Sequence, residues 1–186
     1  MEKTAERGVP KIILVMIPLI LAAMYYYAAF VDTSAPEKTV QNFYQAYFEK
    51  DYNTVASNLS VFWAAQLLPQ YAAMSPQELL AKRPDIETAM ADFLSSYGDN
   101  ASIPDDISVE ILKDYTLLGK NSAVVAYSFK EDGKEKSLEA AFLVKEKGNF
   151  RIYNLAPINR ETLPQVKSFN IKELDQQITK LLQAKK

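Results

Sequence analysis

The chain has 186 residues, of which 48% are hydrophobic and 24% are charged, and its formal net charge is −2. This balance is typical of one globular domain with an ordinary core, and it lacks the basic excess that a nucleic-acid-binding protein needs, so we expect no nucleic-acid partner. The chain contains neither cysteine nor histidine, which excludes disulfides, zinc–cysteine clusters, thiol nucleophiles and imidazole catalysis, and we expect no metal and no cofactor.

An uncharged hydrophobic run covers residues 12–31, between Lys11 and Asp32. A helix rises ~1.5 Å per residue, so this run reaches ~30 Å, the thickness of a hydrocarbon core. The sequence therefore predicts a single transmembrane helix over 12–31, with the bilayer as a partner. Lys3, Arg7 and Lys11 precede the run, and positive flanks stay on the cytoplasmic side. Residues 1–11 are then a cytoplasmic tail, and the C-terminal domain lies outside the cytoplasmic (inner) membrane.

A cleaved signal peptide is the main alternative for this segment. The aliphatic stretch from Ile12 to Met24 has the length of a signal-peptide core. The small-residue pattern at residues 33–35 is followed by Pro36, a poor residue after a cleavage site. An uncleaved anchor is therefore preferred, and a buried core helix is the third alternative.

The first helix of the domain is predicted to begin at Pro36 and to run to about Lys50. Proline is favourable in the first turn of a helix, and Ser34 stands three residues before Glu37 in the pattern of a capping box. Apolar side chains recur at three-four spacing along this segment, at Val40, Phe43, Tyr44, Tyr47 and Phe48. This face must pack against the rest of the domain.

Residues 51–98 are predicted to form several short helices. Asp51 or Asn53 starts the first of them, and Ser60 and Ser75 precede further helical segments; these residues are expected to be the N-caps. Pro84 opens the last of these helices, and Gly98 is expected to end it. The buried stripe of this helix is predicted to contain Ile86, Met90, Phe93, Leu94 and Tyr97.

After residue 98 the hydrophobic pattern changes to a period of two, which is typical of strands. Alternating apolar residues occur in four segments, at 107–111, 123–129, 138–144 and 150–154. The segments are separated by turn sequences, namely Gly119-Lys120-Asn121, Asp132-Gly133 and Gly148-Asn149. We predict an antiparallel meander of about four strands. The charged residues 130–132 and 145–147 at its turns are expected to form a solvated rim.

Residues 161–186 are predicted to be a C-terminal loop and an amphipathic helix that begins after Asn170. Its apolar side consists of Ile171, Leu174, Ile178, Leu181 and Leu182. Packing against the domain is favoured over binding to a partner helix. Together with residues 32–160, which form the main extracytoplasmic domain, these elements predict an α+β fold.

No pair of carboxylates forms a recognisable active site, so no catalytic residue is predicted. Asp105-Asp106 is the most suggestive pair, but its place after Pro104 indicates an exposed loop. The aromatic residues are more informative, because 11 Tyr, 9 Phe and 1 Trp exceed the needs of a small core. A candidate pocket between helices and sheet is lined by Tyr44, Tyr47, Trp63, Tyr127 and Tyr153. Plain core packing is the alternative.

Three segments together resemble the nuclear transport factor 2-like superfamily, a group of α+β cones with a cystatin-like sheet. They are Ala35–Tyr47, with its Phe-Tyr pair, the acidic turn Asp51-Tyr52 and the strand start Gly148–Ile152. The resemblance covers residues 35–158 and implies a curved antiparallel sheet around helices with an inner cavity. The helical stretch 61–97 and the C-terminal helix depart from the family pattern.

The resulting hypothesis is a non-enzymatic, membrane-anchored protein of the bacterial cell envelope that binds a small apolar ligand or a protein partner. Single-span subunits of type IV secretion channels are similar in anchor and fold, which favours an assembly role. The alternative is a cavity enzyme, resembling isomerases or dehydratases, that transfers protons with an Asp and a Tyr. A buried carboxylate facing Tyr127 or Tyr153 in an open cavity would favour the enzyme. A cavity filled by side chains would favour the binding module.

Overall fold

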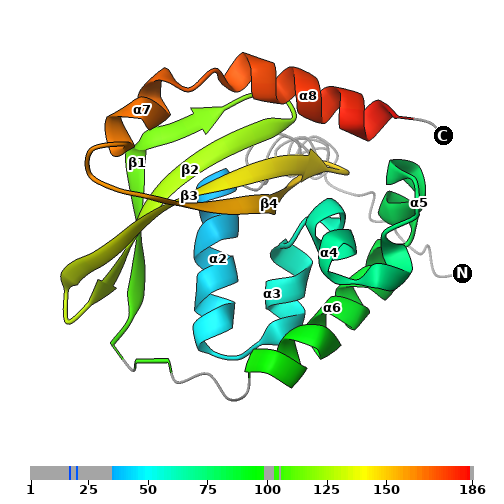
Figure 1. The fold of residues 1–186 in the computed structure, drawn as a ribbon, viewed down its shortest axis with the longest axis horizontal. Coiled ribbons are helices and arrows are strands. Elements are labelled where there is room, and N and C mark those ends of the chain that lie inside the picture. The colour runs from blue at the N-terminus through cyan, green and yellow to red at the C-terminus, as the bar shows by residue number, and fades with distance from the viewer. Residues whose placement is uncertain (1–16, 18–19, 21–34, 99–102, 105, 185–186) are drawn as a thin grey trace, which may run out of the picture. The chain divides into compact units, whose positions relative to one another are not determined.

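The computed structural model describes residues 17, 20, 35–98, 103–104 and 106–184. The chain divides into two compact units, Met1–Thr33 and Ser34–Lys186, and the second contains the folded domain (Figure 1). The predicted tail, 1–11, and nearly all of the predicted span, 12–31, lie outside the described residues. Among the residues that are described, no helix has the length and apolar character needed to cross a bilayer.

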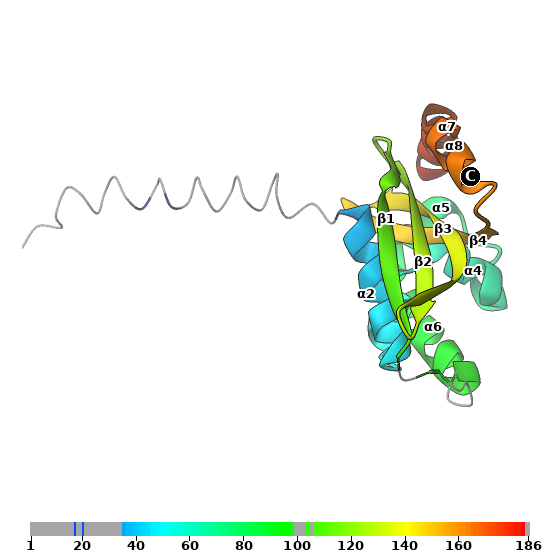
Figure 2. The same ribbon diagram turned by 90° about the vertical axis from the view of Figure 1, so that its left-hand side faces the viewer.

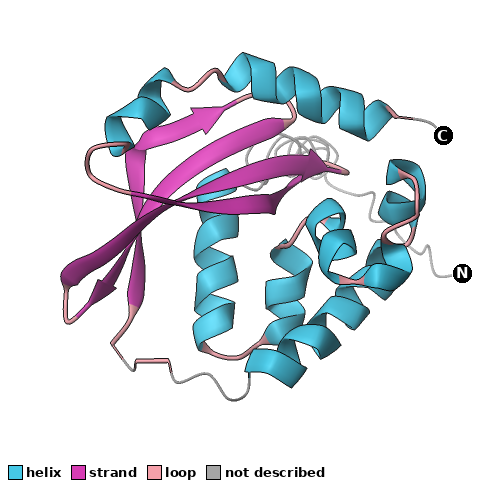
Figure 3. Cartoon of the chain, in the orientation of Figure 1, coloured by secondary structure: helices cyan, strands magenta, loops and turns pink. Residues whose placement is uncertain are grey.

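The first half of the domain is helical (Figure 3). Its elements are α2 (Pro36–Phe48), α3 (Tyr52–Asn58), α4 (Val61–Leu67), the 3-10 helix η2 (Pro69–Tyr71), α5 (Pro76–Ala81) and α6 (Arg83–Gly98). The predicted caps Asp51, Ser60 and Ser75 are confirmed, since each side chain accepts a hydrogen bond from a backbone N–H of the helix it precedes. The cap of α2 differs, because Ala35 occupies that position without a side-chain hydrogen bond.

Helix α6 follows the prediction in part: of its predicted buried stripe, Phe93 and Leu94 are only half-buried and Tyr97 is exposed. Ile86 and Met90 are buried, and the helix ends at Gly98 as expected. Tyr97 is 72% exposed, so its assignment to the buried stripe is wrong. The reason is local: Gly98, not Tyr97, faces the ring of Tyr52, where an added Cβ would collide with the hydroxyl.

The second half of the domain begins with an antiparallel four-stranded meander in the order β1-β2-β3-β4, which confirms the predicted sheet. The strands are β1 (Ser108–Leu118), β2 (Ser122–Glu131), β3 (Lys134–Glu146) and β4 (Asn149–Ile158). Positive φ angles at Asp132 and Gly133, and again at Lys147 and Gly148, match the two-residue turns that suit the twist of a hairpin. Register shifts interrupt all three strand pairs and bend the sheet.

Both faces of the sheet are buried, and the predicted alternation did not anticipate this. Helices α2 to α6 lie on one side, and α7 (Leu163–Ser168) lies on the other. Helix α8 (Ile171–Gln183) follows α7 along the edge of the domain (Figure 1), and its Ile178 joins the main core. Val125 and Tyr127 therefore belong to the main core. Val124, Ala126, Leu138, Ala140, Leu163 and Val166 form a second core beneath α7.

Helix α8 is held against the turn between β1 and β2. The Asp175 carboxylate accepts hydrogen bonds from the Asn121 N–H at 2.6 Å and from the Ser122 hydroxyl at 2.9 Å. The side-chain amide of Asn121 also donates a hydrogen bond to Thr179 Oγ1 at 3.0 Å. Ile178 is buried, so the apolar side of the helix packs on its own domain, the favoured interpretation.

We expect Asp175→Ala to lower the free energy of unfolding by about 1–3 kcal/mol, because it leaves the buried Ser122 hydroxyl without its acceptor. Amide exchange in α8 should become faster while exchange in β2 and β3 stays slow. Gln176→Ala, at the exposed neighbouring position, is the matched control and should leave both measurements unchanged. Equal effects of the two substitutions would contradict the role given to Asp175.

Candidate functional site

Two of the five predicted pocket residues, Tyr44 on α2 and Tyr127 on β2, meet in the core. Their hydroxyl oxygens are 2.7 Å apart. Both hydroxyls also contact Glu139 Oε2 of β3, Tyr127 at 2.7 Å and Tyr44 at 3.1 Å. Two hydroxyl protons serve these three contacts, and in the contact between the two tyrosines either hydroxyl can be the donor. The three groups form one short hydrogen-bonded chain.

Aromatic rings surround this hydrogen-bonded chain. The ring of Tyr44 lies 5.2 Å from that of Tyr127 and 4.9 Å, edge to face, from that of Phe129. Burial is the largest cause of the raised pKa of both tyrosines; the charge of Glu139 raises both further, and the contact with Tyr44 adds to the rise at Tyr127. Both phenols therefore stay protonated at neutral pH and act as hydrogen-bond donors.

The other predicted pocket residues do not join this pair. Tyr47, Trp63 and Tyr153 are half-buried and pack against the main core. Tyr127 has no exposed surface, so the interior between helices and sheet is filled at this point by side chains. The sequence interpretation missed Glu139, whose position opposite Tyr127 depends on the register of the β2–β3 pair.

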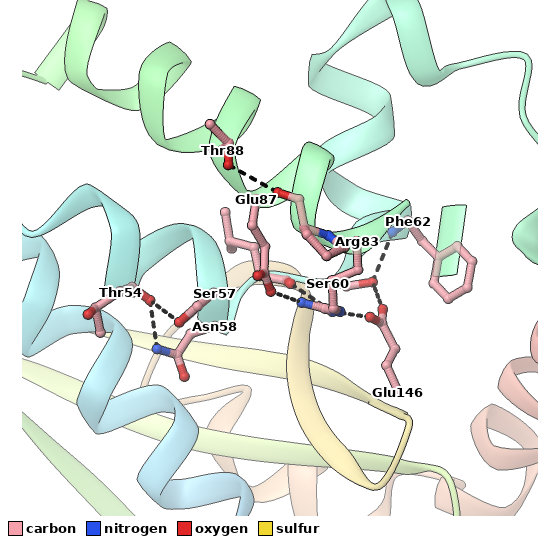
Figure 4. Close-up of polar contacts among 11 residues, drawn as sticks. Thr54, Ser57, Asn58, Ser60, Phe62, Arg83, Glu87, Thr88 and Glu146 are labelled. Atoms are coloured by element: carbon pink, nitrogen blue, oxygen red, sulfur yellow. Dashed lines mark hydrogen bonds and ion pairs between the residues drawn. The ribbon is translucent and has the colours of Figure 1, made fainter. Parts of the chain in front are cut away.

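A second polar cluster joins the helices to the far end of β3 (Figure 4). The Glu146 side chain is fully buried; its Oε1 accepts a hydrogen bond from the Ser60 hydroxyl at 2.6 Å, and its Oε2 pairs with Arg83. Arg83 also pairs with Glu87 and approaches the Leu59 carbonyl at 3.4 Å. The prediction of a solvated rim at residues 145–147 is therefore wrong for Glu146, because the N-terminal ends of α4 and α6 cover it.

Arg151 lies beside this cluster and is half-buried. Its Nε atom is buried and has no hydrogen-bond partner among the described residues. Desolvation lowers the pKa of the Arg151 guanidinium, and the neighbouring charge of Arg83 lowers it further. The carboxylates of Glu146 and Glu87 are both engaged by Arg83, so the cluster links helices to sheet.

A small apolar cavity of about 170 Å³ lies between α7 and the outer face of the sheet. Its lining residues are Val124, Ala140, Phe142, Ala156, Ile158, Thr162, Gln165, Val166 and Phe169. The rings of Phe142 and Phe169 meet edge to face at 5.7 Å, and Phe169 is 40% exposed. Thr162 and Gln165 supply the only side-chain hydrogen-bonding groups in this lining, so the cavity suits a small apolar molecule.

Two larger hollows lie elsewhere on the domain surface. One of about 430 Å³ lies between α2 and the start of β1, beside Gln41, Gln45 and Ser108. The other, of about 400 Å³, lies near the β2–β3 turn beside Phe129 and Lys136. None of the five predicted pocket residues lines either hollow or the cavity under α7.

Of the Asp105-Asp106 pair, the structure describes Asp106, and Asp105 lies outside the described residues. Asp106 is exposed, and its carboxylate accepts a hydrogen bond from the Asp132 N–H at 3.1 Å. Its contact with Asp132 lowers the pKa of Asp106 and raises that of Asp132. In the part of the chain that the structure describes, no three carboxylates gather where they could hold a metal ion.

No model of a known protein family matches the chain, and no curated protein matches it significantly. The likeness to the nuclear transport factor 2-like superfamily therefore stays a prediction, carried by three short segments. The fold and the geometry of the two polar clusters and the cavity are the basis for assigning a function.

Proposed function

We propose that the protein is a single-pass, membrane-anchored extracytoplasmic protein whose α+β domain is a non-enzymatic binding module of the cell envelope. The hydrophobic run 12–31 and its positive flank support the anchor and the orientation. The nuclear transport factor 2-like resemblance is part of this proposal.

One observation carries the binding role: the apolar cavity lies under α7, away from the Tyr44–Tyr127 pair. Side chains fill the inner face of the sheet at Tyr127, where a catalytic cavity would have to open. An apolar cavity of about 150 Å³ is large enough to hold a benzene-sized molecule, and the cavity here is about 170 Å³. The ligand class that fits is a small apolar ring or a short branched alkyl group.

The ligand proposal predicts that p-xylene raises the melting temperature of the protein. Binding to the native state stabilises it with the logarithm of the ligand concentration relative to Kd, by about 2.7 kcal/mol at 100 times Kd. Ala156→Leu extends a side chain into the cavity and should abolish the shift. Ala89→Leu, at a half-buried position on α6, is the control and should preserve it. An equal shift in Ala156→Leu would show that p-xylene binds elsewhere.

Cell fractionation tests the anchor and the orientation. The chain should sediment with membranes, resist extraction by high salt and dissolve in detergent. Protease added to intact spheroplasts should digest the domain. A soluble product that begins near Pro36 would instead indicate a cleaved signal peptide, and a protected domain would reverse the proposed orientation.

A cavity enzyme is the second candidate. The carboxylate of Glu139 favours this alternative, because it accepts a hydrogen bond from the Tyr127 hydroxyl. Such an enzyme needs substrate and solvent to reach that hydroxyl. An open site would let Tyr127 ionise near the ordinary tyrosine pKa of 10.0 in the folded protein, which the ultraviolet absorbance of tyrosinate detects. Ionisation of Tyr127 only on unfolding would favour the binding module.

A further inference from the structure

One end of the domain brings together two strand turns and the beginning of α2. The Lys145 N–H donates to the Asn121 carbonyl at 2.8 Å, which joins the β3–β4 hairpin to the β1–β2 turn. The Thr39 hydroxyl donates to the Phe150 carbonyl at 3.2 Å, which joins the first turns of α2 to β4. Figure 2 shows the start of α2 beside the tip of the β3–β4 hairpin. We call this surface the turn end of the domain.

Lysines dominate the turn end. Lys38, Lys120 and Lys147 are exposed, and the ammonium of Lys145 lies 5.4 Å from the centre of the Phe150 ring. Among the described residues these four lysines form no ion pair with a carboxylate.

The acidic groups near these lysines do little to offset them. Glu146 is buried against Arg83 and Ser60. Asp175 is turned to the Asn121 N–H and the Ser122 hydroxyl. Glu37, which is half-buried on α2, is the one remaining carboxylate on these segments. The turn end therefore carries an uncompensated positive charge, although the whole chain is weakly acidic.

The opposite end of the sheet, around the β2–β3 turn, has a different arrangement. There most cations are neutralised by ion pairs, which are Lys130–Glu110, Lys136–Glu131 and Arg160–Glu135. The two ends have similar numbers of basic residues, so the difference lies in the pairing. Unpaired surface charge of one sign favours an oppositely charged partner.

Chain connectivity limits which end can reach a membrane. Four residues, 32–35, separate the hydrophobic run 12–31 from Pro36. Four residues span at most about 14 Å, even when fully extended. The beginning of α2, and with it the turn end, must therefore stay close to the lipid headgroups if 12–31 crosses the bilayer.

We propose that the turn end binds the anionic headgroups of the outer leaflet and so holds the domain in one orientation on the membrane. This inference rests on the proposed membrane anchor. Each lysine close to an anionic surface strengthens the attraction by a factor on the order of five, and the effect fades beyond a Debye length. The opposite end, with its paired charges, then points away from the membrane.

The test uses the full chain in lipid nanodiscs, and the absence of native cysteine allows single-site labelling. Asn149→Cys places an environment-sensitive dye at the turn end, and Ser137→Cys places it on the exposed opposite end of β3. Quenching by acrylamide, which is uncharged, is compared between phosphatidylcholine discs and discs with about one third phosphatidylglycerol. We expect quenching at Asn149→Cys to fall at least about threefold in the anionic discs and to recover in about 1 M salt. Quenching at Ser137→Cys should not change.

Charge variants separate lipid contact from tethering. Lys120→Gln with Lys147→Gln should restore quenching at Asn149→Cys in anionic discs. Lys113→Gln with Lys134→Gln removes the same charge elsewhere and should leave the protection intact. Equal quenching in both disc types, with the protein still bound to the discs, would overturn the headgroup contact and leave the anchor standing. A protein that elutes apart from the discs would overturn the anchor and the contact together.

Discussion

Arg83→Met is expected to lower the free energy of unfolding by about 3–5 kcal/mol, the usual cost of removing one partner from a buried ion pair. Its partner Glu146 has a side chain with no exposed surface, so the carboxylate would remain in the interior, and the Ser60 hydroxyl would be its one remaining donor among the described residues. The loss should be visible in urea denaturation followed by circular dichroism at neutral pH.

Glu87→Gln is the matched control for this substitution. Glu87 pairs with the same guanidinium, but its side chain is 29% exposed, and partly exposed pairs contribute little, about 0–1 kcal/mol. The double substitution Arg83→Met with Glu146→Leu should recover most of the stability, since an apolar pair can replace a buried ion pair. A loss below about 1 kcal/mol for Arg83→Met would show that Glu146 finds another partner.

The second large effect is expected at alkaline pH. The pKa of Tyr44 and that of Tyr127 are raised in the folded protein, chiefly by burial. Both groups are ionised only in the unfolded chain once the pH exceeds about 10, so the unfolded state binds fewer protons and stability falls as pH rises. Their stabilising contribution is fully present below pH 10. The two tyrosines together should lower the free energy of unfolding by about 3 kcal/mol at pH 11 and by about 5 kcal/mol at pH 12.

Denaturant unfolding at several alkaline pH values measures this loss. The double variant Tyr44→Phe with Tyr127→Phe should be less stable at neutral pH, because Glu139 loses its donors, and its stability should decline less steeply above pH 10. Tyr97→Phe changes a tyrosine that is 72% exposed and should decline as the unmodified protein does. A decline equally steep in the double variant would mean that Tyr127 ionises in the folded state.

The two polar clusters and the apolar cavity lie on different sides of the sheet. Glu146 with Arg83, and Tyr127 with Glu139, join the early helices to the inner face of the sheet. The outer face carries the cavity beneath α7.

Local sequence determined the helix starts and the order of the strands. A capping side chain such as Ser75 acts on N–H groups three residues away, and two-residue turns such as Asp132-Gly133 need φ values that few other residues adopt. These interactions are complete within a few residues, so composition and spacing were enough to predict them. The amphipathic stripe of α8 likewise predicted a packed helix.

Tertiary structure alone decided which polar residues are buried together. The two-residue turn by itself would place Tyr127 opposite Leu138, but the register shift between Phe129 and Lys130 places it opposite Glu139. A shift of one residue exchanges the two faces of a strand, and no local pattern in this sequence marks it. Glu146 stands in a charged turn sequence and becomes buried only because Arg83, 63 residues earlier, packs over it. Contacts between distant segments depend on the packing of the whole domain, which is why the sequence predicted the elements and the structure identified the clusters.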